Sequence, residues 1–435
     1  DTVEYFKSDS VRTALIEFTD GDDALAIADG GALTVSTSLD MNGTELILDA
    51  DADTSITADT DDRIDIKVGN TDVAHITKNV IGGIINRQNA QPFIINGNMA
   101  VDQRQGGASI TANDSTFVVD RWKFRCSQAS KLTAEQVTDV PSGQGFYYST
   151  KITSSSSLSV GASDFFNFSH LLEGQDIAQL MFGSANAKTT TITFWVKSSL
   201  TGNFAVAYNN FQGSARAYPA EYVINSANTW EKKTVVIAGD TSGTWTATNA
   251  TGLGIIWNLG YGSNAQGTKN AWNASDTSSF SGAVNIVATS GATLFITGVQ
   301  LEVGDYDTTT IPPFQHESYC DNLLRCKRYY QQSYTSGVVR GSVATDGAYM
   351  FYIPTTGNTF RYNLNFETAM RAVPTKVFYN PGTGTVGKAG YEGGGDTNAF
   401  TVNTTFNTNK HALIFNTGVP AIGNVYWHWT AESEL

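Results

Sequence analysis

The acidic residues of this chain are gathered at one end, and that asymmetry constrains the fold more than any other feature. Residues 1–85 hold 18 of the 41 acidic residues, but only 5 of the 27 basic residues and 3 of the 49 aromatic residues. This segment carries a net charge of −13, against −14 for the whole chain. The remaining residues are nearly neutral and rich in aromatic side chains, so the two regions must fold by different means.

The acidic segment contains short runs in which Leu, Ile and Val alternate or cluster, as at 45–49, 63–68 and 73–77. Pairs of Gly, Asp and Asn punctuate these runs as turn signals. Strands this short cannot bury enough surface within one chain. We therefore expect residues 1–85 to form an intertwined β-stalk of three copies, each covering the open strand edges of the others. A disordered acidic linker is the alternative, but the apolar alternation is too regular for a linker.

Three alternating acids, Asp49, Asp51 and Asp53, raise the question of a calcium site. Calcium needs six to eight oxygen atoms that converge on one point. Alternating acids in a strand share a face but spread along it, and the spacing of an EF-hand loop is absent. We therefore expect a solvated acidic face, with no metal or cofactor.

The rest of the chain has the composition of a β protein, because Gly, Thr, Ser and Asn replace much of the usual charge. Clean period-two alternation predicts strands at 189–197, 232–237, 254–259 and 292–301. We expect a mostly β chain whose domains are a stalk (1–85), a jelly-roll sandwich (86–316), a linking helix (317–334) and a distal C-terminal β-sandwich (335–435).

Three local features belong to this scheme. A helix is expected over residues 317–332, because acids lie at its start and bases towards its end. Trp195 and Trp257 lie in apolar strands, so we expect both in the core. Residues 382–396 contain seven glycines and should form a mobile loop.

Several motifs between residues 93 and 435, about four-fifths of the chain, resemble a family of tailed-bacteriophage tail-fibre proteins. The motifs lie at residues 93–99 (FIINGNM), 102–105 (DQRQ), 119–122 (VDRW), 194–198 (FWVKS), 298–304 (GVQLEVG), 313–319 (PFQHESY), 326–330 (CKRYY), 370–375 (MRAVPT) and 429–435 (WTAESEL). The resemblance implies a jelly roll like that of a carbohydrate-binding module, a homotrimer and a role in host attachment. It hands over no site residues, and we interpret its motif residues mainly as scaffold: Asp120 and Arg121 as a buried ion pair beside the indole of Trp122.

The sequence offers little for catalysis, and we expect no enzyme. No nucleophile elbow, zinc-protease, phosphate-loop or dinucleotide-binding motif lies in a fitting context. Three cysteines are not a disulfide framework. No basic patch suits nucleic acid, and no apolar run of 18 residues suits membrane insertion. The start at Asp1 leaves open whether a segment precedes it.

Aromatic residues in polar loops are the candidate ligand contacts, because sugars stack their C–H faces on rings and bond to amides and carboxylates. We single out Trp272, Tyr261 and Asn264 in the jelly roll, and Tyr391 with Glu392 near the C terminus. Packing against a neighbouring subunit is the other explanation for these aromatics.

The expected function is that of a virion fibre that attaches a phage to its bacterial host, binding a surface polysaccharide or lipopolysaccharide. Other virion tail or baseplate proteins would bind its N-terminal part. One alternative is a purely structural head or baseplate fibre. Another is a polysaccharide-degrading tailspike, which needs two carboxylates at a set separation; residues 93–435 lack the long β-helix repeats usual in such spikes.

Overall fold

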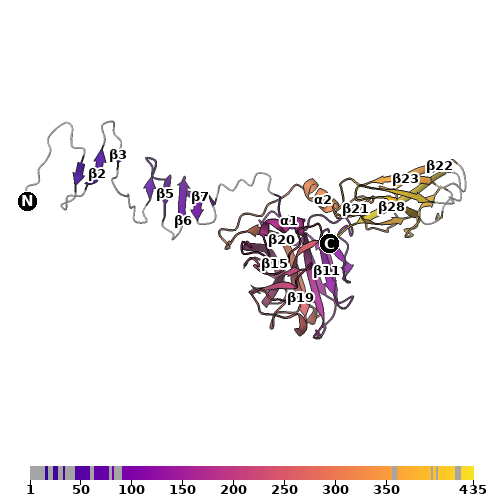
Figure 1. The fold of residues 1–435 in the computed structure, drawn as a ribbon, viewed down its shortest axis with the longest axis horizontal. Coiled ribbons are helices and arrows are strands. Elements are labelled where there is room, and N and C mark those ends of the chain that lie inside the picture. Colours follow the sequence, from indigo (N-terminus) through magenta and orange to yellow (C-terminus); the bar gives the residue numbers. More distant parts are fainter. Residues whose placement is uncertain are drawn as a thin grey trace, which may run out of the picture. The chain divides into compact units, whose positions relative to one another are not determined.

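The structure of the protein is a computed structural model. It describes residues 45–58, 63–77, 91–354, 360–392, 395–397, 400–416 and 423–435, with the strand backbones at 15–17, 23–27, 33–34 and 81–82. Contacts divide the chain into two compact units, Asp1–Arg87 and Gln88–Leu435. Each unit is described by itself (Figure 1).

The first unit contains two antiparallel sheets made of short strands that follow one another in sequence. One sheet consists of β1 (Leu15–Glu17), β2 (Asp23–Ile27) and β3 (Leu33–Thr34). The other consists of β4 (Leu46–Ile47), β5 (Ser55–Thr57), β6 (Arg63–Val68), β7 (Thr71–Thr77) and β8 (Ile81–Gly82). Strands were predicted at 45–49, 63–68 and 73–77, and each of these runs contains strand residues. The predicted extent was too long for the first run, because only two residues of it pair.

The three alternating acids that were considered as a calcium site do not lie along a strand, as was expected. Asp49, Asp51 and Asp53 lie in the turn between β4 and β5 rather than along a strand. The turn brings one carboxylate oxygen from each to within 4.8 Å of the others. Asp49 also accepts a hydrogen bond from the backbone N–H of Thr54 at 3.2 Å. The idea that these acids spread along a strand was therefore wrong.

The second unit begins with a sandwich of two six-stranded antiparallel sheets. The first sheet has the order β10 (Phe117–Val119), β11 (Trp122–Cys126), β14 (Phe165–Glu173), β19 (Thr251–Tyr261), β16 (Gly202–Asn210), β17 (Arg216–Ile224). The second has the order β18 (Glu231–Ile237), β15 (Thr190–Ser198), β20 (Thr293–Val303), β13 (Ser149–Ser154), β12 (Leu132–Val137), β9 (Ile110–Thr111). Short helical turns, α1 (Gly174–Ile177), Ala178–Leu180, Ser263–Ala265 and Ile286–Ala288, join some of them. The four period-two predictions fall on β15, β18, β19 and β20.

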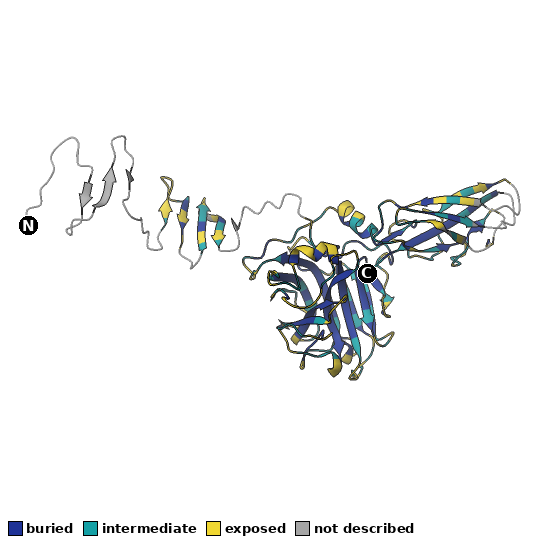
Figure 2. Ribbon diagram, viewed as in Figure 1, coloured by how far each residue is buried: buried dark blue, intermediate teal, exposed yellow. Residues whose placement is uncertain are grey.

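The core lies between the two sheets, where Figure 2 shows buried residues on the facing strands. The indole of Trp257 is 5.5 Å from that of Trp122 and 5.3 Å from the ring of Phe194, all three fully buried. Trp257 is thus a core residue, as predicted. The prediction for Trp195 was wrong: Phe194 and Val196 point inwards, so Trp195 faces outwards and is half-buried.

The C-terminal β domain packs two further sheets around a second core. In one sheet the long strand β28 (Gly423–Glu432) pairs with β21 (Tyr330–Gln332), β22 (Tyr349–Ile353), β24 (Thr375–Tyr379) and β25 (Gly390–Tyr391). The other contains β23 (Phe360–Asn365), β27 (His411–Asn416) and β26 (Phe400–Asn407). This arrangement agrees with the β-sandwich expected for the end of the chain.

The linking helix is shorter than the predicted range of 317–332. Helix α2 spans Tyr319–Lys327, and the side chain of Ser318 caps it by accepting the N–H of Asp321 at 3.1 Å. Tyr330 belongs to β21 instead, where it pairs with Glu432 and is fully buried. Aromatic residues suit strands, and pairing with β28 buries this ring more completely than one face of an exposed helix would.

The glycine-rich segment 382–396, expected as a mobile loop, contains ordered structure within its described part. Its residues Gly390 and Tyr391 form β25. The side chain of Asn380 holds the segment from one side, since its Oδ1 accepts the N–H of Gly382 at 2.8 Å and its Nδ2 donates to Asp396 at 2.6 Å. The described part of the segment is therefore a loop that contains one two-residue strand, and its mobility stays a prediction.

Two negative expectations can be compared with the described residues. Cys126, Cys320 and Cys326 are all free, the first and last buried. No helix in the part of the chain that the structure describes is long and apolar enough to cross a membrane.

Candidate functional site

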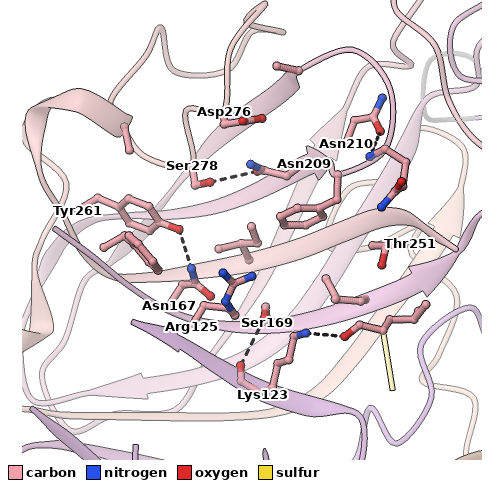
Figure 3. A pocket seen from close by; sticks show the side chains of 18 of the residues that line it. Lys123, Arg125, Asn167, Ser169, Asn209, Asn210, Thr251, Tyr261, Asp276 and Ser278 are labelled. Carbon is pink, nitrogen blue, oxygen red and sulfur yellow. Dashed lines mark hydrogen bonds between the residues drawn. The ribbon is translucent and has the colours of Figure 1, made fainter. Parts of the chain in front are cut away.

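A cleft of about 700 Å³ opens on the outer face of the sheet that contains β11, β14, β19 and β16 (Figure 3). The strands supply its floor, and the loops that follow β16 and β19 supply its walls. Its volume lies within the roughly 300–1,000 Å³ of ordinary ligand pockets.

The floor of the cleft is polar because strand β14 alternates between apolar and polar residues. Phe166 and Phe168 point into the core and are fully buried, whereas Asn167 and Ser169 line the cleft. These two polar residues are only 4% and 1% exposed, since the cleft walls and neighbouring strands surround them. Asn167 and Ser169 therefore point to the outer face of the sheet, where they give the floor of the cleft its hydrogen-bonding groups.

Hydrogen bonds hold most of the floor groups in place. Asn167 Nδ2 donates to the hydroxyl of Tyr261 at 2.7 Å, and Ser278 Oγ donates to Asn209 Oδ1 at 3.2 Å. Asn167 Oδ1 is buried and has no hydrogen-bond partner within the described ranges. A buried acceptor without a donor is unfavourable, so the floor has some hydrogen-bonding capacity that the protein itself does not use.

Charged side chains flank the floor. Lys123 and Arg125 extend from β11 on the same side, and Asp276 lies on the loop opposite. Burial lowers the pKa of Lys123 to about 8, and its ammonium group donates to the backbone oxygen of Leu435. Arg125 donates from Nε to Asp114 at 2.7 Å. Its terminal N–H groups bond to no described residue, so they remain available as a planar donor pair.

One aromatic ring stands partly exposed in the cleft. Phe211, just after β16, is 43% exposed and lies over Gly254 of β19. A Cβ at residue 254 would overlap this ring, so the ring can rest on the sheet only because residue 254 is glycine. The result is a flat apolar surface beside polar groups, which is the combination that sugar rings require.

Two of the five predicted site residues line this cleft. Tyr261 ends β19 and is 5% exposed, so its hydroxyl is a floor group rather than a free loop aromatic. Asn264 lies in the short helical turn Ser263–Ala265 and donates from Nδ2 to Ser163 Oγ at 2.9 Å. Both residues thus stand at one end of the same hollow.

Trp272 lies elsewhere, in a packed aromatic cluster. Its indole is 5.8 Å from that of Trp245 and 5.9 Å from the ring of Phe182. Its Nε1 donates to the backbone oxygen of Ala238 at 2.8 Å. The half-buried side chain supports the loops of the sandwich and does not line the cleft.

Tyr391 and Glu392 lie in the C-terminal β domain and not at the cleft. Tyr391 pairs with Val425 of β28 and packs against the second core. Glu392 Oε2 accepts the backbone N–H of Asn424 at 2.8 Å and its side-chain amide at 3.0 Å. Glu392 therefore ties β25 to β28.

Sequence reasoning missed most of the cleft. The missed residues are Lys123, Arg125, Asn167, Ser169, Asn209 and Phe211. A signal did exist: in Phe165–Glu173 and in Trp122–Cys126, polar or charged residues alternate with core aromatics. Such alternation marks one solvent-facing side of a sheet, but it does not say which side is hollowed.

The Asp-Arg-Trp motif is scaffold, but its ion pairing differs from the interpretation given. Asp120 pairs with Arg104 at 3.3 Å, while Arg121 pairs with Glu434 near the end of the sequence. Glu434 also accepts from Arg104 at 2.9 Å. Trp122 is fully buried beside them and donates to the backbone oxygen of Asn96 at 2.9 Å.

Comparisons with known proteins find only distant similarities. No family model matches the chain, and no curated protein matches it. Among solved structures, the enzymatically active domain of tailspike protein 4 of bacteriophage CBA120 is 14% identical, with a TM-score of 0.28. The match covers 49% of this chain and only 21% of that one.

Two other similar structures are matched almost along their whole length. A family 4 carbohydrate-binding module is 14% identical over 48% of this chain and 98% of that one, with a TM-score of 0.26. A candidate sugar-binding protein from Bacteroides thetaiotaomicron is 12% identical over 49% and 100%, with a TM-score of 0.29. Similarities this low carry no argument about ligand or activity.

Proposed function

We propose that the cleft binds a glycan, and that the protein is a non-enzymatic fibre of a tailed bacterial virus that attaches the virion to its host. The observation that carries the glycan proposal is the polar floor around Asn167 and Asn209 beside the half-exposed ring of Phe211. Amides and hydroxyls suit sugar hydroxyls, and the ring suits a sugar C–H face. The attachment role rests on the sequence motifs of residues 93–435.

Binding is a better account of the cleft than cleavage. Hydrolysis of a glycosidic bond normally uses two carboxyl groups, roughly 5–9.5 Å apart. Among the described residues that line the cleft, Asp276 is the one acid. A host polysaccharide or lipopolysaccharide would therefore be held and not cut.

The first unit supports a homotrimer as part of the proposal. One face of the β4–β8 sheet carries Leu46, Ile56 and Ile64, which are 41%, 37% and 42% exposed. The opposite face carries Ser55 and Asp65, which are 0% and 3% exposed. An apolar face left in water is unfavourable by about 25 cal/mol per Å², and further copies of the chain would cover it.

A microarray of purified bacterial surface polysaccharides tests the glycan proposal directly. We expect the protein to bind at least one of them, and Phe211→Ala to weaken that binding about tenfold through lost stacking. Tyr147→Ala is the matched control, because Tyr147 is 69% exposed and does not line the cleft. Binding to none of the polysaccharides, or equal losses in both variants, would refute the proposal for this cleft. Failure of the purified protein to block virus adsorption would refute the attachment role.

A further inference from the structure

A second hollow of about 720 Å³ lies where the jelly roll meets the C-terminal β domain. Phe117 and Lys123 line it from the jelly roll. Arg340, Val373 and Thr375 line it from the C-terminal domain. Its walls thus come from two sandwiches whose mutual position decides whether the hollow exists.

Buried contacts fix that position. Arg328 donates from Nε and Nη2 to the carboxylate of Glu173 at 2.7 and 2.8 Å, and Glu173 is fully buried. Arg371 donates to the backbone oxygens of Asn249, Ser433 and Glu434 at 2.7–2.9 Å. Together with the Arg104 and Arg121 pairs to Glu434, these bonds form a continuous polar interface. These contacts between the domains therefore set the shape of the second hollow.

The second hollow adjoins the cleft. Lys123 and Leu435 line both hollows, and the Lys123 ammonium donates to the Leu435 backbone oxygen. A ligand that leaves the cleft at this end would pass directly into the second hollow.

The second hollow also presents accessible groups of its own. The Arg340 side chain is 38% exposed, and its one ion pair with a described residue is a long one, 3.8 Å to Glu432. Glu432 is itself 37% exposed on the side chain. Val373 is 54% exposed beside them. A weakly engaged guanidinium, a carboxylate and an apolar surface repeat the chemistry of the cleft.

We propose that the two hollows form one groove for an extended polysaccharide, with the C-terminal domain supplying a second subsite. This proposal rests on the glycan function proposed for the cleft. It predicts that the protein grips an internal stretch of a long chain and not a single sugar or a chain end. Each added contact within one ligand raises affinity, so affinity should increase with chain length until both hollows are filled.

The test uses the full chain and fragments of the polysaccharide that the array identifies. Calorimetry compares single repeating units with multi-repeat fragments. We expect the multi-repeat fragments to bind at least about tenfold more tightly. A tenfold gain in affinity corresponds to one additional hydrogen bond to a charged group. Arg340→Ala should abolish this gain while leaving single repeats unaffected. Arg361→Ala, an exposed arginine on β23 outside both hollows, is the matched control.

A second variant tests whether a loss of binding in Arg340→Ala comes from the second hollow as a whole and not from a change confined to residue 340. Val373→Trp fills the second hollow from an exposed position, so it should also reduce binding of long fragments alone. Equal affinity for short and long fragments, or long-fragment binding that neither variant weakens, would overturn the shared groove and leave the cleft proposal standing. Loss of single-repeat binding in Phe211→Ala, by contrast, reports on the cleft itself.

Discussion

Replacing Glu434 by alanine tests how the two domains of the second unit are held together. The Glu434 side chain is 6% exposed, and its carboxylate accepts from both Arg104 and Arg121, whose side chains are 1% and 2% exposed. Arg104 also stacks on Tyr330 at 3.8 Å, and Arg121 on Tyr329 at 3.4 Å.

The magnitude follows from the local charge balance. With Asp120 included, the buried part of the cluster holds two guanidinium groups and two carboxylates, while Glu432, 3.9 Å from Arg104, is 37% exposed. Removing one carboxylate leaves a net buried positive charge, and breaking a buried pair in this way destabilises by about 3–5 kcal/mol. That is a large share of the roughly 5–15 kcal/mol typical of a whole domain. Glu434→Gln keeps the shape and loses only the charge, so its loss should be smaller.

The assay is urea unfolding of the full chain, followed by tryptophan fluorescence at neutral pH. Glu367→Ala is the matched control, since that side chain is 61% exposed and pairs with Lys327 at the surface. Such a pair contributes about 0–1 kcal/mol. If Glu434→Ala lowers the free energy of unfolding no more than Glu367→Ala does, the reasoning from buried charge is wrong.

Glu434 should also make the free energy of unfolding depend on pH in the acidic range. Burial by itself raises the pKa of Glu434, but Arg121 and Arg104 outweigh it and hold the pKa below the ordinary value of 4.5. The unfolded chain therefore takes up this proton first as the pH falls, and the stabilisation from Glu434 is lost below about pH 4.5. The free energy of unfolding of Glu434→Gln should fall less steeply in that range than that of the native chain. Parallel acid curves would contradict the assignment.

Three further changes have defined outcomes. Burial lowers the pKa of Lys123 to about 8, so between about pH 8 and 10.5 the unfolded chain holds this proton and the folded chain does not. The free energy of unfolding should therefore rise over that range. Urea titrations at several pH values should show that Lys123→Met removes the rise. Gly254→Ala should displace the Phe211 ring and weaken glycan binding about as much as Phe211→Ala does, and unchanged affinity would show that the ring does not contact the glycan. Ile64→Asp should convert a trimer to monomers in light scattering, whereas Val386→Asp, at a position 64% exposed, should not; a native chain that is already monomeric would refute the stalk.

The sequence was sufficient to predict those strands whose alternation has a clean period of two. β15 and β20 carry such alternation because one side of each faces the sandwich core. The same rule failed for Trp195, since an aromatic residue next to Phe194 can face either way and only the register decides. It also failed beyond Lys327, where a partner strand about a hundred residues later in the chain ends the helix pattern.

The candidate site was harder to predict, because it depends on how separate strands and loops meet. Tyr261 and Asn264 were found because both lie in one polar, loop-like run; Tyr261 ends β19 and Asn264 lies in the helical turn that follows. Trp272 lies in an equally polar run, but its indole packs against neighbouring aromatic rings, including that of Trp245. Asn167 and Asn209 come to share one floor only through the order of β14, β19 and β16, which a single sequence does not reveal.

The ion pair between Arg121 and Glu434 can form only late in the synthesis of the chain, because the two residues are far apart in sequence. The two residues are 313 positions apart. At roughly 5–20 residues per second, a ribosome adds the second residue about 16–60 s after the first. During that interval the guanidinium group of Arg121 cannot meet its carboxylate and must stay hydrated. The jelly roll therefore stays without this ion pair until residue 434 has been made, so Arg121 gains its carboxylate only after the C-terminal β domain has been synthesised.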